Sequence, residues 1–151
     1  IRVSGRFYYI CVIIDIFSRK AIAWEIGCKI DTDLVIRTLK KAYQIRKPSN
    51  DLIFHSDRGC QYTSSKFRKL LDDLGIVQSF SAKGYPYDNA VSESFFKYLK
   101  KEELYRHAYS SLEDLKLALF KYIDGFYNKS RPHSANDMLS PDERENLFSI
   151  S

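Results

Sequence analysis

Several features are scarce in this chain, and each absence excludes a class of protein. The 151 residues include only 3 cysteines, widely spaced and with no C-x-x-C pair, so we expect a reducing cytoplasm rather than a disulfide framework. The 3 histidines lack zinc-binding spacing with any cysteine. No apolar run approaches the roughly 20 residues of a membrane-spanning helix, and the first residues do not resemble a signal peptide.

The chain also lacks a large excess of either charge. The chain has 24 Lys and Arg against 19 Asp and Glu, a net charge of +5. This mild excess permits a polyanionic partner such as nucleic acid without requiring one. Hydrophobic residues make up 44% and aromatic residues 15%, which excludes general disorder. The length predicts one domain with its own core.

The first part of the chain predicts a β-hairpin. Residues 7–16 are almost unbroken Tyr, Ile, Val and Cys, which is typical of a buried strand, and Ser4-Gly5-Arg6 before them is typical of a turn. A turn at 15–20 leads to a second strand over 21–28. Strands joined this tightly must be antiparallel.

Helical and strand patterns then alternate. A helix is predicted from Asp31 or Thr32 to about Arg46, because its apolar residues recur at helical spacing and Pro48 stops it. We expect strands at 52–55 and 76–80, a helix stopped by Gly75, a loop over 82–89, and helices at about 90–104 and 112–126. This order predicts an α/β fold, a mixed sheet with helices on both faces. Residues 1–128 form the predicted core and 129–151 a C-terminal tail.

Asp57 is the first candidate site residue. It follows the strand at 52–55, and Gly59 frees the backbone to turn away. Ligands gather at the carboxyl ends of strands in open α/β sheets, so this position favours a functional carboxylate. The alternative is a solvated Asp that starts a turn.

Glu93 is the second candidate. On a helical wheel Glu93, Lys97 and Lys100 lie opposite the apolar side that carries Phe95 and Leu99. An ordinary solvated face with a Glu–Lys pair, worth roughly 0.2–0.5 kcal/mol, is one interpretation. The other is an acid that binds a metal ion beside two lysines that bind phosphates.

The spacing of Asp57 and Glu93 along the chain is compatible with one shared site. The 35 residues between Asp57 and Glu93 contain a helix, a strand and a loop, so the chain can leave a strand end and return beside it. Two carboxylates at one place repel unless a cation lies between them, and Mg²⁺ prefers such oxygen ligands. Two ions about 3.5–4 Å apart can promote phosphoryl transfer.

Five segments make the sequence resemble a known family. They are Val12–Arg19 with Ala23-Trp24, His55–Gly59 with Gln61-Tyr62, Ser81–Gly84 with Tyr87–Ala90, Glu93–Phe96 with Leu99-Lys100, and Tyr127-Asn128 with Arg131–Ala135 and Leu139–Pro141. In this order they resemble the catalytic core of bacterial insertion-sequence transposases of the OrfB type, in the retroviral-integrase superfamily. The resemblance covers about residues 1–143.

The resemblance implies a fold, a site and a cofactor. It implies an RNase H-like three-layer fold with a mixed five-stranded sheet, whose first strand is mostly truncated here, and a DD(35)E active site with two Mg²⁺ or Mn²⁺ ions. Asp57 corresponds to the second metal-binding Asp and Glu93 to the catalytic Glu. DNA contacts are expected from Lys83, Lys97 and Lys100, with Asn89 beside the scissile phosphate.

The match is incomplete at its two ends. The family's first catalytic Asp aligns a few residues upstream of Ile1, so we expect residues 1–151 to bind metal weakly and to have little activity. Asp15 is not expected to replace it, because it lies at the far end of an antiparallel strand and suits the following turn. The tail departs from the family at Asn136-Asp137-Met138, which leaves its docking open, and His133 is expected to pack rather than contact DNA.

The resemblance implies DNA cleavage and strand transfer by the full-length protein. Its partners would be transposon ends, target DNA and further copies of itself on DNA, with no membrane. Two alternatives remain open from the sequence: a nuclease of the RNase H or resolvase type, and a non-catalytic remnant that binds nucleic acid.

Overall fold

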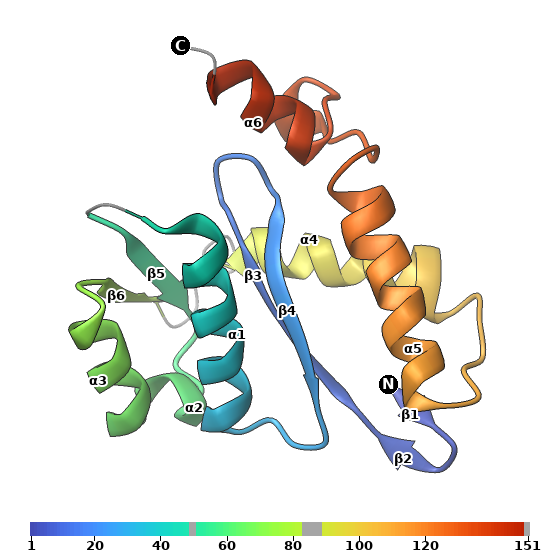
Figure 1. Ribbon diagram of the computed structural model, residues 1–151, viewed down its shortest axis with the longest axis horizontal. Coiled ribbons are helices and arrows are strands. Elements are labelled where there is room, and N and C mark those ends of the chain that lie inside the picture. The colour runs from blue at the N-terminus through green and yellow to red at the C-terminus, as the bar shows by residue number, and fades with distance from the viewer. Residues whose placement is uncertain (49–50, 83–88, 150–151) are drawn as a thin grey trace.

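A β-hairpin lies at the centre of the molecule, with helices on both sides of it (Figure 1). The computed structural model describes residues 1–48, 51–82 and 89–149, so Lys83 lies outside the described residues, as does most of the predicted loop at 82–89. In chain order the elements are β1 (Arg2–Val3), β2 (Arg6–Phe7), β3 (Tyr9–Ile14), β4 (Ala21–Gly27), α1 (Thr32–Arg46), β5 (Ile53–Ser56), α2 (Cys60–Thr63), α3 (Ser65–Asp73), β6 (Val77–Phe80), α4 (Ala90–Leu99), η2 (Lys100–Leu104), α5 (Leu112–Leu119), η3 (Phe120–Tyr127), η4 (Ser134–Asn136) and α6 (Pro141–Ser149). None of the helices in these ranges is long and apolar enough to cross a membrane.

The hairpin β3–β4 separates two hydrophobic cores. Its strands pair antiparallel from Tyr9↔Gly27 to Ile14↔Ala21, as predicted. Because successive side chains of a strand point to opposite faces, Cys11 packs with α1 and α3 on one face. Val12 packs on the other face against the core of α4, α5 and η3. Helices therefore cover both faces, as the α/β prediction required.

The helix α1 begins and ends where its sequence predicts. The Asp31 side chain accepts a hydrogen bond from the Leu34 amide at 2.9 Å, which satisfies one of the free donors of the first turn. The helix ends at Lys47, which has a left-handed backbone with φ 45°. One face buries Leu34, Val35, Ile36, Thr38, Leu39 and Ala42, so α1 fixes the position of the hairpin on its side.

The expected five-stranded sheet is not continuous among the described residues. They form three two-stranded sheets, β1–β2 and β3–β4 antiparallel and β5–β6 parallel. The strands β3 and β5 belong to separate sheets, and no described strand joins their facing edges by hydrogen bonds. Next to the β1–β2 hairpin, the main chain of Ile1 pairs with that of Tyr8, with N–H···O distances of 2.6 and 2.8 Å.

The tail docks onto the turn between β3 and β4 through buried amide side chains. Asn128 accepts a hydrogen bond from the Ala21 amide at 2.9 Å and donates one to the Ala21 carbonyl at 3.0 Å. Asn136, which departs from the family pattern, donates to the Ser18 carbonyl at 2.7 Å and is fully buried. The departure at Asn136 thus supplies a contact that holds the tail.

Ion pairs hold the last helix, α6, against the same turn. Glu145 contacts the Arg46 guanidinium and the Ser18 hydroxyl, and Asp142 pairs with Lys20 at 2.9 Å. Half-buried Glu145 has its pKa lowered below the usual value by these partners, against the opposing effect of burial. Neither α6 nor the short helix α2 was predicted from the sequence.

Replacing Asn128 by Ala should destabilise the protein, because both main-chain groups of Ala21 would lose a buried partner. We expect a loss of about 2–3 kcal/mol in the free energy of unfolding, measured by urea denaturation. The control is Lys129→Ala, an exposed neighbour, for which we expect a change within about 0.5 kcal/mol. Equal effects of the two substitutions would show that the Asn128 hydrogen bonds contribute no net stability.

The open edge of β3 predicts an alternating pattern of amide hydrogen exchange along this strand in residues 1–151. The Tyr8 amide points toward Ile1, so the amides of Ile10 and Val12 point to the same edge, away from β4. The Cys11 amide points to β4. In hydrogen-exchange NMR, Cys11 should exchange at least ~10-fold more slowly than its two neighbours. Equal protection at the three amides would contradict the open edge.

Candidate active site

A groove of about 1330 Å³ lies between β3 and β5 and is bordered by α1 and α4. Its lining is mostly apolar along β3 and α1. Its lining includes five residues that the sequence singled out, namely Asp57, Asn89, Glu93, Lys97 and Lys100. The structure therefore places these predicted site residues in one groove, although they come from two separate parts of the chain.

Asp57 stands directly after β5, in a turn where Gly59 leaves room for neighbouring side chains. The Asp57 Oδ1 accepts a hydrogen bond from the Gly59 amide at 2.8 Å. A Cβ on Gly59 would come within 3.0 Å of the same oxygen and 2.9 Å of the Gln61 side chain, so these two side chains would have to shift. The turn thus orients the exposed Asp57 carboxylate, and Asp57 Oδ2 forms no hydrogen bond within the described residues.

A hydrogen-bond network connects the ends of β5 and β6 to the start of α4. His55 Nε2 lies 3.1 Å from the Ser81 hydroxyl, and His55 Nδ1 lies 2.9 Å from the Ser79 hydroxyl. Ser81 Oγ donates to Asn89 Oδ1 at 2.7 Å. A hydroxyl has one proton, so with that proton on the Asn89 bond, Ser81 Oγ accepts a hydrogen bond from His55 Nε2–H.

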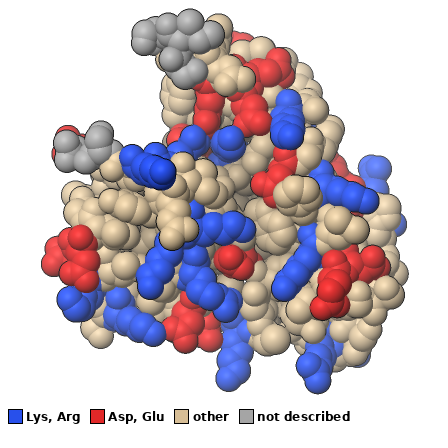
Figure 2. Space-filling model, in the orientation of Figure 1, with Lys and Arg blue, Asp and Glu red and all other residues tan. Residues whose placement is uncertain are grey.

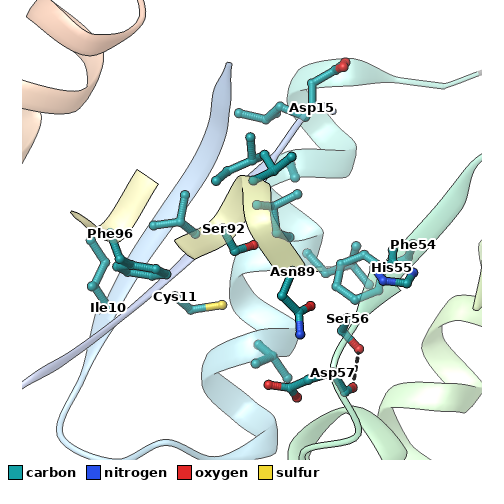
Figure 3. A pocket seen from close by; sticks show the side chains of 18 of the residues that line it. Ile10, Cys11, Asp15, Phe54, His55, Ser56, Asp57, Asn89, Ser92 and Phe96 are labelled. Carbon is teal, nitrogen blue, oxygen red and sulfur yellow. Dashed lines mark hydrogen bonds between the residues drawn. The ribbon is translucent and has the colours of Figure 1, made fainter. Parts of the chain in front are cut away.

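This network directs Asn89 toward Asp57. In Figure 3 the Asn89 amide extends from the start of α4 to the space beside Ser56 and Asp57. The sequence identified Asn89 but missed the residues that hold it, Ser81 and His55. Both occur in segments that carried the family resemblance, but sequence spacing gave no sign of their contact.

The helix α4 presents its polar side to the groove. Phe95 and Leu99 are fully buried, whereas Glu93, Lys97 and Lys100 are exposed, as the helical wheel predicted. Among the described residues, the Glu93 carboxylate forms no hydrogen bond or ion pair. The predicted helix over 90–104 changes at Lys100 into a π-helical turn, η2, which also lines the groove.

Asp15 lies at the other end of the groove from Asp57 (Figure 3). Its Oδ1 accepts hydrogen bonds from the amides of Phe17 at 2.8 Å and Ser18 at 3.3 Å, and its Oδ2 lies 3.4 Å from Arg46. The structure therefore gives Asp15 a role in the turn, in agreement with its rejection as a catalytic substitute.

Tyr62 and Cys11 form a buried layer behind Asp57. Burial, followed by the charges of Cys11 and Asp57, raises the pKa of the Tyr62 hydroxyl well above its usual value. Burial likewise raises the pKa of the Cys11 thiol. Both groups are therefore neutral at pH 7 and offer no negative charge to a cation. The carboxylates are the negatively charged groups in this part of the groove.

The donor set suits a hard divalent cation in part. Carboxylate oxygens are the ligands that Mg²⁺ and Mn²⁺ prefer, and Asp57 and Glu93 both face the groove. Across the described ranges, however, no three His, Cys, Asp or Glu side chains are grouped so as to hold a metal ion. The described residues therefore fit as two members of a larger ligand set.

Comparison with known proteins identifies the family. Two models described as integrase core domain match residues 1–86 and 74–141. The chain belongs to the integrase core domain family. It is 39% identical over 137 residues to the transposase for insertion sequence element IS904 of Lactococcus lactis, covering 91% of this chain and 54% of that protein. It is 37% identical over 146 residues to the transposase InsF of IS3A of Escherichia coli K12, covering 97% and 51%.

A third relative carries a different name. A Lactococcus lactis protein named ATP-dependent protease is 47% identical over 111 residues, covering 73% of this chain and 36% of that protein. The chain thus spans about a third to a half of the length of these relatives.

Solved integrases share the fold of this integrase core. The simian T-cell lymphotropic virus intasome in complex with PP2A regulatory subunit B56 gamma matches with TM-score 0.75 at 17% identity, covering 95% of this chain and 50% of that chain. The HTLV-2 integrase catalytic core domain in complex with magnesium matches with TM-score 0.66 at 16% identity, covering 93% and 86%. These likenesses confirm the RNase H-like α/β fold.

The network around Ser81 predicts a measurable loss when it is broken. Ser81→Ala removes a partner from both His55 and Asn89, so we expect a decrease of about 1–2 kcal/mol in the free energy of unfolding and a changed ¹⁵N shift at His55 Nε2. The control is Ser94→Ala on the exposed surface of α4. If neither quantity differs between the two variants, Ser81 does not hold the site together.

Proposed function

We propose that the complete protein to which this integrase core belongs cleaves DNA and transfers DNA strands in transposition. The observation that supports this is that Asp57 and Glu93, with 35 residues between them in the sequence, line one groove together with Lys97 and Lys100. Carboxylates and lysines that line the same groove suit a metal-dependent reaction at a phosphodiester.

Each of these residues has a proposed role. Asp57 and Glu93 hold Mg²⁺ or Mn²⁺, two ions in the complete site, and the ions neutralise the charge that develops on the phosphate oxygens. Lys97 and Lys100 bind neighbouring backbone phosphates, which makes affinity fall steeply with salt. Asn89, held by Ser81, positions the DNA beside Asp57, and Lys83 is a further phosphate contact.

The proposed reaction has two displacements at phosphorus. Water attacks a phosphodiester at the end of the element, the bond to the 3′ oxygen breaks, and that oxygen leaves as a 3′-hydroxyl. The 3′-hydroxyl then attacks a second phosphodiester in line, and the displaced 3′ oxygen of the target takes up the proton. Positioning and charge neutralisation suffice, so no covalent bond to the protein is needed.

The reaction is proposed for the longer protein rather than for residues 1–151. Of the three carboxylates that the described residues contribute to the groove, Asp15 belongs to the turn after β3, and no three described residues form a metal-binding group. We therefore propose weak metal binding and little cleavage by residues 1–151 alone. For the complete protein the proposed partners are transposon ends, target DNA and further copies of the protein. Figure 2 shows many Lys and Arg side chains across one face, interspersed with acidic ones, in keeping with a mildly basic DNA-binding protein.

The test is Mg²⁺-dependent cleavage of a duplex that carries an element end, by the complete protein. Asp57→Asn and Glu93→Gln should each lower the cleavage rate at least ~100-fold, because each removes a charged metal ligand. The control Glu113→Gln changes an exposed acid on α5 and should leave the rate unchanged.

Two further substrates separate the alternatives. An RNA–DNA hybrid and a four-way junction should be cut poorly, and the cut element end should join to target DNA. Undiminished cleavage by Asp57→Asn would overturn the proposed site. Cleavage of the hybrid or junction without joining would replace transposition by a nuclease function.

A further inference from the structure

A second cavity, of about 840 Å³, lies on the side of α4 away from Lys97 and Lys100. Two sequence motifs that the proposed function does not use meet there. Arg19, at the end of the β3–β4 turn, lines it together with Arg131 and His133 of the tail. The cavity is therefore formed only when the tail is docked onto the core, and it includes none of the carboxylates of the first groove.

Two polar side chains in this cavity have buried atoms without partners. Arg19 Nη1 and His133 Nε2 are both buried and find no hydrogen-bond partner among the described residues, and His133 is only 8% exposed. A buried polar group without a partner is costly. Arg19 also has a left-handed backbone with φ 66°, a strained conformation for a residue other than glycine. The fold thus buries Arg19 Nη1 and His133 Nε2, although no described group forms a hydrogen bond with either atom.

The remaining charges of the cavity favour an anion. Arg19, Arg106 and Arg131 line it against a single described acid, Glu102. Glu102 is already engaged, because it accepts hydrogen bonds from Arg131 Nε and Nη2 and from the Tyr122 hydroxyl. The charges of Arg19 and Arg106 are therefore not neutralised by the described lining.

His133 is neutral in this environment. Burial, followed by the charges of Arg131 and Arg19, lowers the pKa of His133 to about 4, while Glu102 opposes the shift. A neutral imidazole can keep a proton on Nε2 and donate it. The positive potential that keeps His133 neutral is the potential that attracts an anion to the same place.

The walls of the cavity suit a group that is larger than a bare ion. The Arg131 guanidinium lies 3.7 Å from the centre of the Tyr98 ring, and Tyr122 and Phe126 add further aromatic surface. Arginine stacked on an aromatic ring is a common surface for phosphate and nucleic acid. The volume lies within the range of small-molecule sites.

We propose that this cavity binds a phosphate group, with the lining side chains of Arg19, Arg106 and His133 donating hydrogen bonds to its oxygens. The same chemistry is offered by a backbone phosphate of DNA and by free phosphate. Because it uses no residue of the Asp57–Glu93 groove, this proposal does not depend on the proposed function.

The experiment measures the thermal unfolding of the chain in sodium phosphate, with sodium chloride added to keep the ionic strength constant. Phosphate should raise the Tm progressively with the logarithm of its concentration above the Kd, by about 2–4 °C. The rise should persist in Arg68→Gln, a control that removes an exposed Arg on α3, and should be absent in Arg19→Gln. Cooperative unfolding of Arg19→Gln without phosphate shows that the variant is folded.

A measurement on the unsubstituted chain keeps the test independent of the variants. Inorganic phosphate should shift the ¹⁵N signal of His133 Nε2 saturably, and the Kd from this titration should account for the rise in Tm. A short single-stranded oligonucleotide is then added: displacement of phosphate assigns the site to DNA, and no displacement assigns it to free phosphate. The proposal is overturned if the His133 signal does not move, or if Arg19→Gln and Arg68→Gln respond equally to phosphate.

Discussion

The pairing of β3 with β4 is the interaction on which the other features of the molecule depend. Its register, from Tyr9↔Gly27 onward, sends alternate side chains into two separate cores. One core holds α1 and α3, and the other holds α4 and α5. A shift of one residue would exchange the two faces, so this register determines on which side of the hairpin each helix, and with it each site residue, is placed.

The helix α4 connects the two cavities. Glu93 and Lys97 face the groove beside β5, while Ser94 and Tyr98 face the cavity formed with the tail. Its buried face, with Phe95 and Leu99, fixes the rotation of the helix, so neither set of polar residues can move without the other.

The long elements were predictable because each carries a local signal of its own. Asp31 and Pro48 mark the ends of α1, and the β-rich run before Asp15 marks β3. The tail was harder, because α6 has no apolar periodicity and is held by ion pairs such as Arg46–Glu145, which join residues 99 positions apart. The predicted five-stranded sheet was interrupted because no described strand pairs with β3 and β5 at once.

The sequence by itself determined the types of the main elements, the α/β class and the candidates Asp57 and Glu93, because strand and helix periods and cap residues act over a few neighbours. Only the tertiary structure decided which distant groups meet: Ser81 holding Asn89, Asn128 holding Ala21, and Arg19 lying with His133 in one cavity. These contacts depend on how whole helices and strands pack against a shared core. The spacing of residues within one element does not specify that packing.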